Sequence, residues 1–85
     1  MKLENNNFTI YEVEEIKKDF SKLLEENKVV LDLENITKID MSAMQLLIAL
    51  KKSCEESKKE FEIKNLKQEV LSSFEITGIA YVLGV

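Results

Sequence analysis

KVVLDLENITKIDMSAMQLLIAL, residues 28–50, is the stretch that decides the fold. Its first part, Lys28 to Leu33, is a short apolar and β-branched run, which is typical of a central parallel strand buried on both faces. A loop over residues 34–40 follows, and we expect Ile36 and Ile39 to turn inward beneath it. From Ser42 to Ser57 the apolar residues recur at helical spacing, which predicts a long helix packed deeply on a sheet.

This second helix carries an unusually broad apolar face. Its central row is Ala43, Leu47, Leu50 and Cys54, and Met44, Ile48, Leu46 and Ala49 widen it on both sides. Cys54 is the only cysteine and the chain has no histidine. An internal disulfide is therefore excluded, a zinc site is not expected, and Cys54 is predicted to be an inert core residue.

The segment before residue 28 predicts a strand and a helix. Phe8-Thr9-Ile10-Tyr11 has strand character, and the Asn5-Asn6-Asn7 triplet before it is a turn signal, so a small opening hairpin is expected. Between Glu12 and Asn27 the period becomes helical. One stripe of that helix is apolar and consists of Val13, Ile16, Phe20, Leu23 and Leu24.

The segment after the second helix continues the alternation of strand and helix. Phe61 to Lys64 alternates in polarity, which predicts a strand with one wet face. A third helix is expected from Lys67 to Thr77, with Val70, Leu71 and Phe74 buried and Gly78 as its left-handed cap. The tail 79–83 fits either a last strand or a short helix. The whole chain, 1–85, is thus predicted to be a single α/β domain with a right-handed crossover and a partly parallel sheet.

Composition excludes several classes of function. The formal charge is −4, from 12 basic and 16 acidic residues, and this balance argues against nucleic-acid binding. Residues 1–5 lack the apolar core of a signal peptide, and the longest fully apolar run, 46–50, is far too short to span a bilayer. We therefore expect a cytoplasmic protein without membrane insertion and without a cofactor.

The candidate site lies at residues 40–45, where the loop ends and the second helix begins. Ser42 followed by Gln45 fits a capping box, although Asp40 competes for the role of helix cap. A helix start also tolerates phosphate because its amides are unpaired and its dipole is positive. Ser42 is therefore a candidate phosphorylation site as well, and the two roles are compatible. Met41, as a flexible exposed thioether, suits an adaptable contact surface.

In these residues the chain resembles the STAS domain of bacterial anti-sigma factor antagonists. The resemblance spans Val29 to Ile79, and Phe8 to Leu24 is similar to the family's second strand and first helix. The motifs that carry it are VVLDLENITKID at 29–40, the serine-containing helix start at 41–45, QLLIAL at 45–50, IKNL at 63–66 and FEITGI at 74–79.

The resemblance implies a fold, a partner and a switch. The fold is a mixed, mostly parallel sheet of four to five strands with helices packed on one face. The partner is a kinase-like anti-sigma factor, or a similar protein, that phosphorylates Ser42 and thereby releases the complex. The implied partner-binding residues are Asp40, Met41, Ser42, Ala43 and Gln45.

The sequence departs from the family at this helix start. The family commonly has Asp-Ser-Ser-Gly-Leu-Gly, whereas this chain has Met41, Ala43 and Gln45 in place of a serine and two glycines. The QLLIAL run is closer to STAS proteins of chemotaxis clusters or lipid-transport (ABC transporter) complexes. The alternative hypothesis is therefore a constitutive interaction subunit of such a complex, with Ser42 acting only as a cap.

An enzyme is not expected. Without histidine, no serine or cysteine nucleophile can be paired with an imidazole base, and no Gly-Lys-Ser phosphate loop is present. Asp32 and Asp40 could in principle form a paired-carboxylate site. We expect instead that Asp32 lies in a strand and faces solvent or a partner, and that Asp40 caps a helix.

Overall fold

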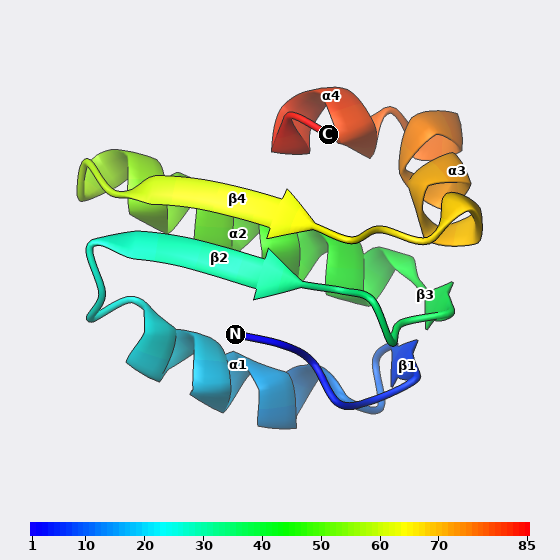
Figure 1. Cartoon of the computed structure of the whole chain (residues 1–85), viewed down its shortest axis with the longest axis horizontal. Coiled ribbons are helices and arrows are strands. Elements are labelled where there is room, and N and C mark those ends of the chain that lie inside the picture. Colours follow the sequence, from blue (N-terminus) through cyan, green and yellow to red (C-terminus); the bar gives the residue numbers. More distant parts are fainter.

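A computed structural model describes all residues from 1 to 85 and contains four short strands and four helices (Figure 1). The elements in chain order are β1 (Asn7–Phe8), α1 (Val13–Leu23), β2 (Lys28–Asp32), β3 (Lys38–Ile39), α2 (Met41–Glu56), β4 (Glu60–Lys64), α3 (Gln68–Thr77) and α4 (Ile79–Leu83). The predicted α/β class and the predicted positions of the three main helices are confirmed, and the tail left open between strand and helix is a short helix.

The centre of the fold is the parallel pair β2 and β4. Lys28 lies opposite Glu60 and Asp32 lies opposite Lys64, and α2 is the crossover that connects the two strands. The first residues of the chain run along the other edge of β2, where the terminal amine of Met1 donates to the carbonyl of Val30 at 2.7 Å. A single parallel bridge joins Lys2 to Asp32.

The structure does not confirm the expected sheet of four to five strands. It contains two separate two-stranded sheets, β2 with β4 and β1 with β3, and both pairs are parallel. β1 and β3 are two residues long, and the leading segment makes only one bridge to β2. Pairing this brief does not extend the central ladder into one continuous sheet.

The expected opening hairpin was wrong. The leading segment pairs with β2 and not with the residues after Asn7, and the strand character ends at Phe8. The carboxylate of Glu12 accepts hydrogen bonds from the amide and the hydroxyl of Thr9, at 2.9 and 2.7 Å. This local pair bends the chain into a turn that leads directly into α1.

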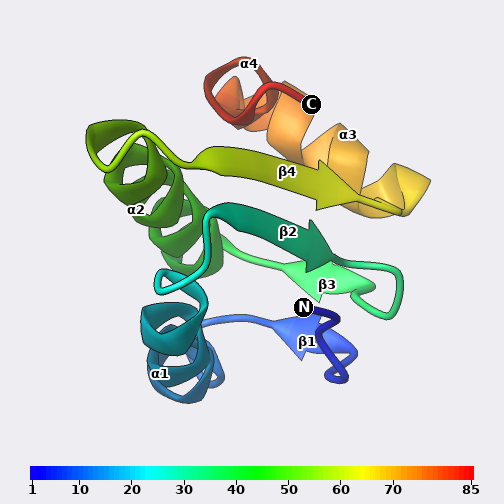
Figure 2. The same ribbon diagram turned by 60° about the vertical axis from the view of Figure 1, so that its left-hand side comes forward.

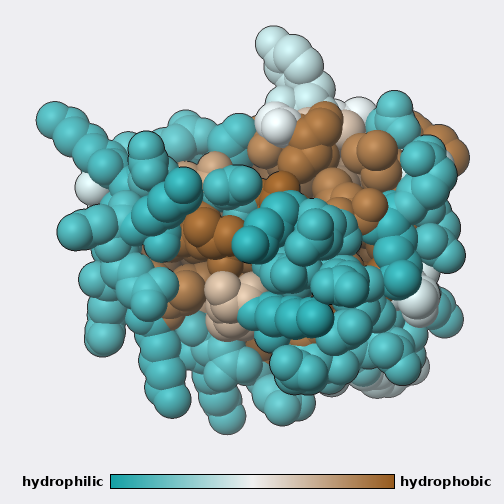
Figure 3. Space-filling model, viewed as in Figure 1, coloured by the Kyte–Doolittle hydropathy of each residue, from teal (hydrophilic) through white to brown (hydrophobic).

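The first two helices lie on one side of the strands. Figure 2 shows α1 and α2 together on that side. α3 packs against β3 and α4, and α4 packs against α2. Val29, Leu31 and Leu33 point towards the core and are fully buried, but Val30 is only partly buried. The prediction that β2 is buried on both faces was therefore wrong, because no helix covers the second face. Figure 3 views that face, where hydrophilic side chains surround smaller apolar patches.

A single hydrophobic cluster holds the elements together. α1 contributes Ile16, Phe20 and Leu23, and α2 contributes Ala43, Met44, Leu47, Leu50 and Cys54. The central row predicted for α2 is therefore confirmed, whereas Ala49, which was expected to widen it, is exposed. In the stripe predicted for α1, Val13 and Leu24 are only partly buried. Cys54 is fully buried, as expected, and burial raises the pKa of its thiol. None of the helices combines the length and the hydropathy that a membrane-spanning segment requires.

Gly78 ends α3 and precedes α4 in a left-handed conformation with φ +79°. The predicted left-handed cap is therefore confirmed. This single residue lets the chain fold back, so that Ile79, Ala80 and Leu83 reach the core.

Gly78→Ala is expected to lower the free energy of unfolding by about 1 kcal/mol. An added Cβ would meet no atom within 4 Å, so the cost is one of backbone conformation alone. Denaturant titration of the two proteins measures it. Gly78→Asn should cost less, since asparagine tolerates the left-handed region better than alanine. Equal stability of Gly78→Ala and wild type would contradict this account.

Candidate functional site

Asp40 caps α2 and ties it to a distant turn. Its backbone is extended, with φ −122° and ψ 179°, and its Oδ1 accepts from the amide of Ala43 at 3.1 Å. Its Oδ2 accepts from the amide of Ile10 at 2.9 Å, and its own amide donates to the carbonyl of Phe8 at 3.3 Å. One carboxylate therefore fixes the helix start against the turn that precedes α1.

The predicted Ser42–Gln45 capping box was wrong. Ser42 is the second helical residue of α2, and Gln45 is exposed and does not reach back to it. The structure thus resolves the competition for the cap in favour of Asp40. As a consequence the Ser42 hydroxyl, which makes no hydrogen bond within the protein, is not needed to complete the helix end.

The predicted site residues divide into surface and core. Ser42 is half-buried, Met41 is 48 % exposed, and Gln45 is exposed, so these three side chains lie at the surface of the first turn of α2. Ala43 is fully buried and cannot contact a docking protein, because it points into the core one residue after Ser42. Asp40 is half-buried and engaged by the two amides.

Two apolar side chains that the sequence interpretation missed lie beside this turn. Ile10 is 61 % exposed and Tyr11 is 90 % exposed, and the hydrogen bond from Ile10 to Asp40 brings them to the start of α2. The sequence predicted them as part of a strand. The pattern Thr9-x-x-Glu12 was the available signal, because a threonine followed three residues later by a glutamate marks a helix start.

A shallow hollow of about 430 Å³ continues the same surface along α2. It is lined by Met41, Gln45, Ile48, Ala49 and Lys52 of α2 and by Thr77 and Ile79 from the end of α3 and the start of α4. The α2 residues recur at helical spacing, so they form one face of the helix. We call Met41, Ser42, Gln45, Ile48 and Ala49 the docking surface.

Asp32 and Asp40 accept hydrogen bonds from different groups and share no partner. Asp32 accepts from the amide of Glu34 at 2.9 Å and from the side-chain amide of Asn65 at 3.0 Å. The Glu34 amide is the main cause that lowers the pKa of Asp32, and Asn65, Lys2 and Lys64 act in the same direction. Asp32 thus holds together the loops that follow β2 and β4. No group of three or more His, Cys, Asp or Glu side chains is arranged to hold a metal ion.

One family model matches the chain. It is described as "Mlab, STAS domain", and it matches residues 5–84, which is nearly the whole length. No curated protein matches the chain at a significant level. The match covers the turn at Ile10, the whole of α2 and both segments that line the hollow.

Proposed function

We propose that this chain, which belongs to the STAS domain family, is a regulatory protein-binding module that is switched by phosphorylation of Ser42. The observation that carries the proposal is the Ser42 hydroxyl, which is partly exposed at the first turn of α2 and makes no hydrogen bond there. Asp40 performs the capping, so modification of Ser42 leaves the helix end intact.

The physical effect of a phosphate at Ser42 is a change of surface charge. A phosphate adds about 1.5 to 2 negative charges, which the amides and dipole of the α2 start partly stabilise. The neighbouring Asp40 carboxylate repels the phosphate, and the two groups together make the surface at the start of α2 strongly acidic. A partner that buries Met41 and Gln45 would then have to bury that charge. The complex is expected to dissociate for this reason.

The proposed partner is a serine-kinase-like anti-sigma factor or a similar protein. It would bind through the docking surface, with Ile10 and Tyr11 as an apolar rim. The role is one of binding, and the proposal assigns the chain no catalytic step and no cofactor.

Phosphorylation is tested on the protein isolated from its own cells. Intact-mass measurement should find a fraction with the added mass of one phosphate. This fraction should disappear in Ser42→Ala and persist in Ser57→Ala, which removes an exposed hydroxyl at the other end of the same helix. An unmodified wild-type protein, or a phosphate that survives in Ser42→Ala, would rule out the switch.

The second candidate is a constitutive interaction subunit of a chemotaxis or lipid-transport complex. The hollow favours it, because the apolar side chains of Ile48 and Ala49 extend the docking surface well beyond Ser42. Ser42→Asp separates the two candidates without disturbing the Asp40 cap. Partner binding should be lost in Ser42→Asp if the switch exists. It should survive in Ser42→Asp, and fail in Ile48→Glu, if binding is constitutive.

A further inference from the structure

The outer edge of β4 has no hydrogen-bonding partner. β4 pairs with β2 on one side only. The amide of Glu60 donates to Asn27 and the carbonyl of Lys64 accepts from Leu33, so alternate residues of β4 direct their backbone groups towards β2. The amides and carbonyls of Phe61 and Ile63 therefore point to the opposite edge, where no segment of the protein pairs with them.

This edge lacks most of the features that prevent strands from associating. β4 is five residues long, which makes it as long as any strand in the fold, and it contains neither proline nor a bulge. The side chains of Phe61 and Ile63 pack on the core but remain partly exposed. An added strand would satisfy four backbone groups and cover these two side chains.

We propose that β4 pairs with β4 of a second copy of this chain, antiparallel about a two-fold axis at Glu62. The two central ladders then join into one continuous four-stranded sheet. In this register Phe61 lies opposite the partner's Ile63, so the free backbone groups bond to each other. Glu60 lies opposite the partner's Lys64, and the symmetry repeats this attractive pair.

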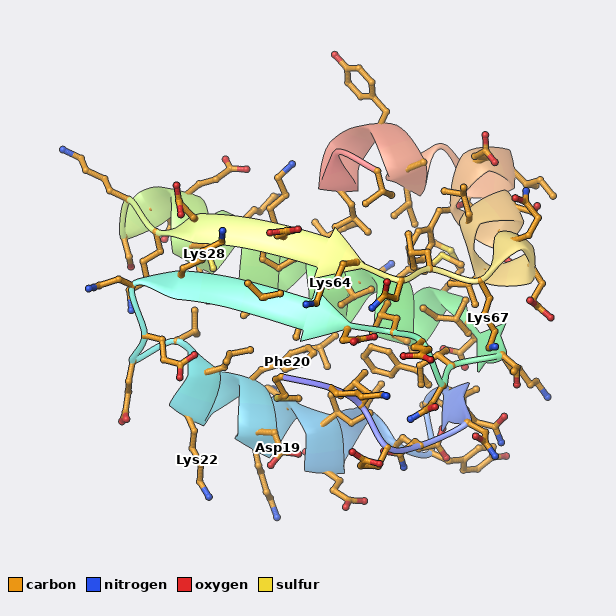
Figure 4. The ribbon with its side chains drawn as sticks, viewed as in Figure 1. Asp19, Phe20, Lys22, Lys28, Lys64 and Lys67 are labelled. Carbon is orange, nitrogen blue, oxygen red and sulfur yellow. The ribbon has the colours of Figure 1, made fainter.

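Each copy brings a lysine close to the like charges that meet on the axis. The two Glu62 side chains face one another, but Lys28 Nζ of the same chain lies 3.6 Å from Glu62 Oε2 and 4.0 Å from Glu60 Oε2. Lys28 and Lys64 both lie over the strands on the face that no helix covers (Figure 4). Each acidic side chain of the joined ladder thus has a lysine beside it.

The competing arrangements are less favourable. Parallel pairing in register places like charges opposite each other along the whole strand. An axis at Phe61 sets Glu60 opposite the partner's Glu62 in two places. An axis at Ile63 overlaps only residues 62–64, because Asn65 has a φ of +59° and leaves the extended conformation. Charge therefore disfavours the axis at Phe61 and the short overlap disfavours the axis at Ile63, which leaves the axis at Glu62.

A charge-swap experiment tests the pairing by sedimentation velocity over a range of protein concentrations. Wild type should form dimers as the concentration rises. Glu60→Lys and Lys64→Glu should each weaken self-association about tenfold or more, because each turns both attractive pairs into repulsive ones. An equimolar mixture of the two variants should dimerise again, since the lysine introduced at position 60 of one chain would then face the glutamate introduced at position 64 of the other. Lys18→Glu, an equal charge change on exposed α1, should behave as wild type.

A second measurement on wild type needs no variant. Hydrogen exchange of the Phe61 and Ile63 amides should slow as the concentration rises, whereas the exchange of the β2-paired Glu62 amide should change little. The proposal is overturned if the protein stays monomeric up to millimolar concentration. It is equally overturned if dimerisation is insensitive to both charge reversals, if their mixture stays monomeric, or if the two amides exchange at a rate independent of concentration.

Discussion

Phe8→Ala is expected to lower the free energy of unfolding by about 3–5 kcal/mol. Phe8 is completely buried, and its ring meets that of Phe20 edge to face, with centroids 6.3 Å apart and planes at 82°. The ring also holds β1 in place, because β1 is only two residues long and pairs with β3 over those two residues alone. Its removal leaves a cavity between α1 and the β1–β3 pair.

The size of this effect matters because small domains have little stability to lose. A total of about 5–15 kcal/mol is usual, so this substitution would remove a large fraction of it. Urea titration followed by far-ultraviolet circular dichroism measures the change. Tyr11→Ala is the matched control, an aromatic truncation three residues away at a side chain that is 90 % exposed, and it should stay within about 0.5 kcal/mol of wild type. Comparable losses in both variants would contradict the assignment of Phe8 to the core.

The central βαβ unit was predictable because its signals are strong and local. The β-branched run before Asp32 and the long helical period after Asp40 each admit one interpretation, and β2, α2 and β4 lie close to where they were expected. The burial of β2 was not predictable in the same way. An apolar residue such as Val30 is predicted to lie in the core. Its exposure depends on whether helices cover the second face of the strands, and no helix does, so Val30 is only partly buried.

The start of the chain was mispredicted because two local signals compete there. Phe8-Thr9-Ile10-Tyr11 has high strand propensity, but the Thr9–Glu12 pair stabilises a turn that ends the strand after Phe8. Propensity describes single residues, whereas the turn depends on a specific pair of side chains. The pair prevailed because it satisfies the amide of Thr9 as the chain enters α1.

The residues of the candidate site on α2 were predictable from the sequence, whereas the residues that approach it from the turn before α1 were not. The sequence placed Ser42 and Met41 at the surface of a helix start. The sequence could not decide whether Asp40 or Ser42 caps the helix. Asp40 stands three residues before the amide of Ala43, and Ser42 stands three residues before Gln45, so both have the spacing of a cap. Ile10 and Tyr11 reach the site through a hydrogen bond between residues 30 apart in the chain, and no local pattern reports such a contact.

The double role of Asp40 predicts that Asp40→Ala lowers the free energy of unfolding by about 2–3 kcal/mol. Loss of a helix cap costs about 1 kcal/mol, and loss of a hydrogen bond to a charged group adds about 1.5 kcal/mol or more. Both are lost together, since Oδ1 binds the amide of Ala43 and Oδ2 binds the amide of Ile10. Thermal and denaturant unfolding measure the sum.

Two further variants separate the contributions. Asp40→Asn keeps one side-chain acceptor for the Ala43 amide but turns an NH₂ group towards the amide of Ile10. It should therefore lose the hydrogen bond from Ile10 and retain the helix cap. Its cost should fall between that of wild type and that of Asp40→Ala. Ser42→Ala should stay within about 0.5 kcal/mol of wild type, because its hydroxyl makes no hydrogen bond. If Ser42→Ala costs as much as Asp40→Ala, then Ser42 has a structural role, and a free hydroxyl at the start of α2 can no longer support the switch.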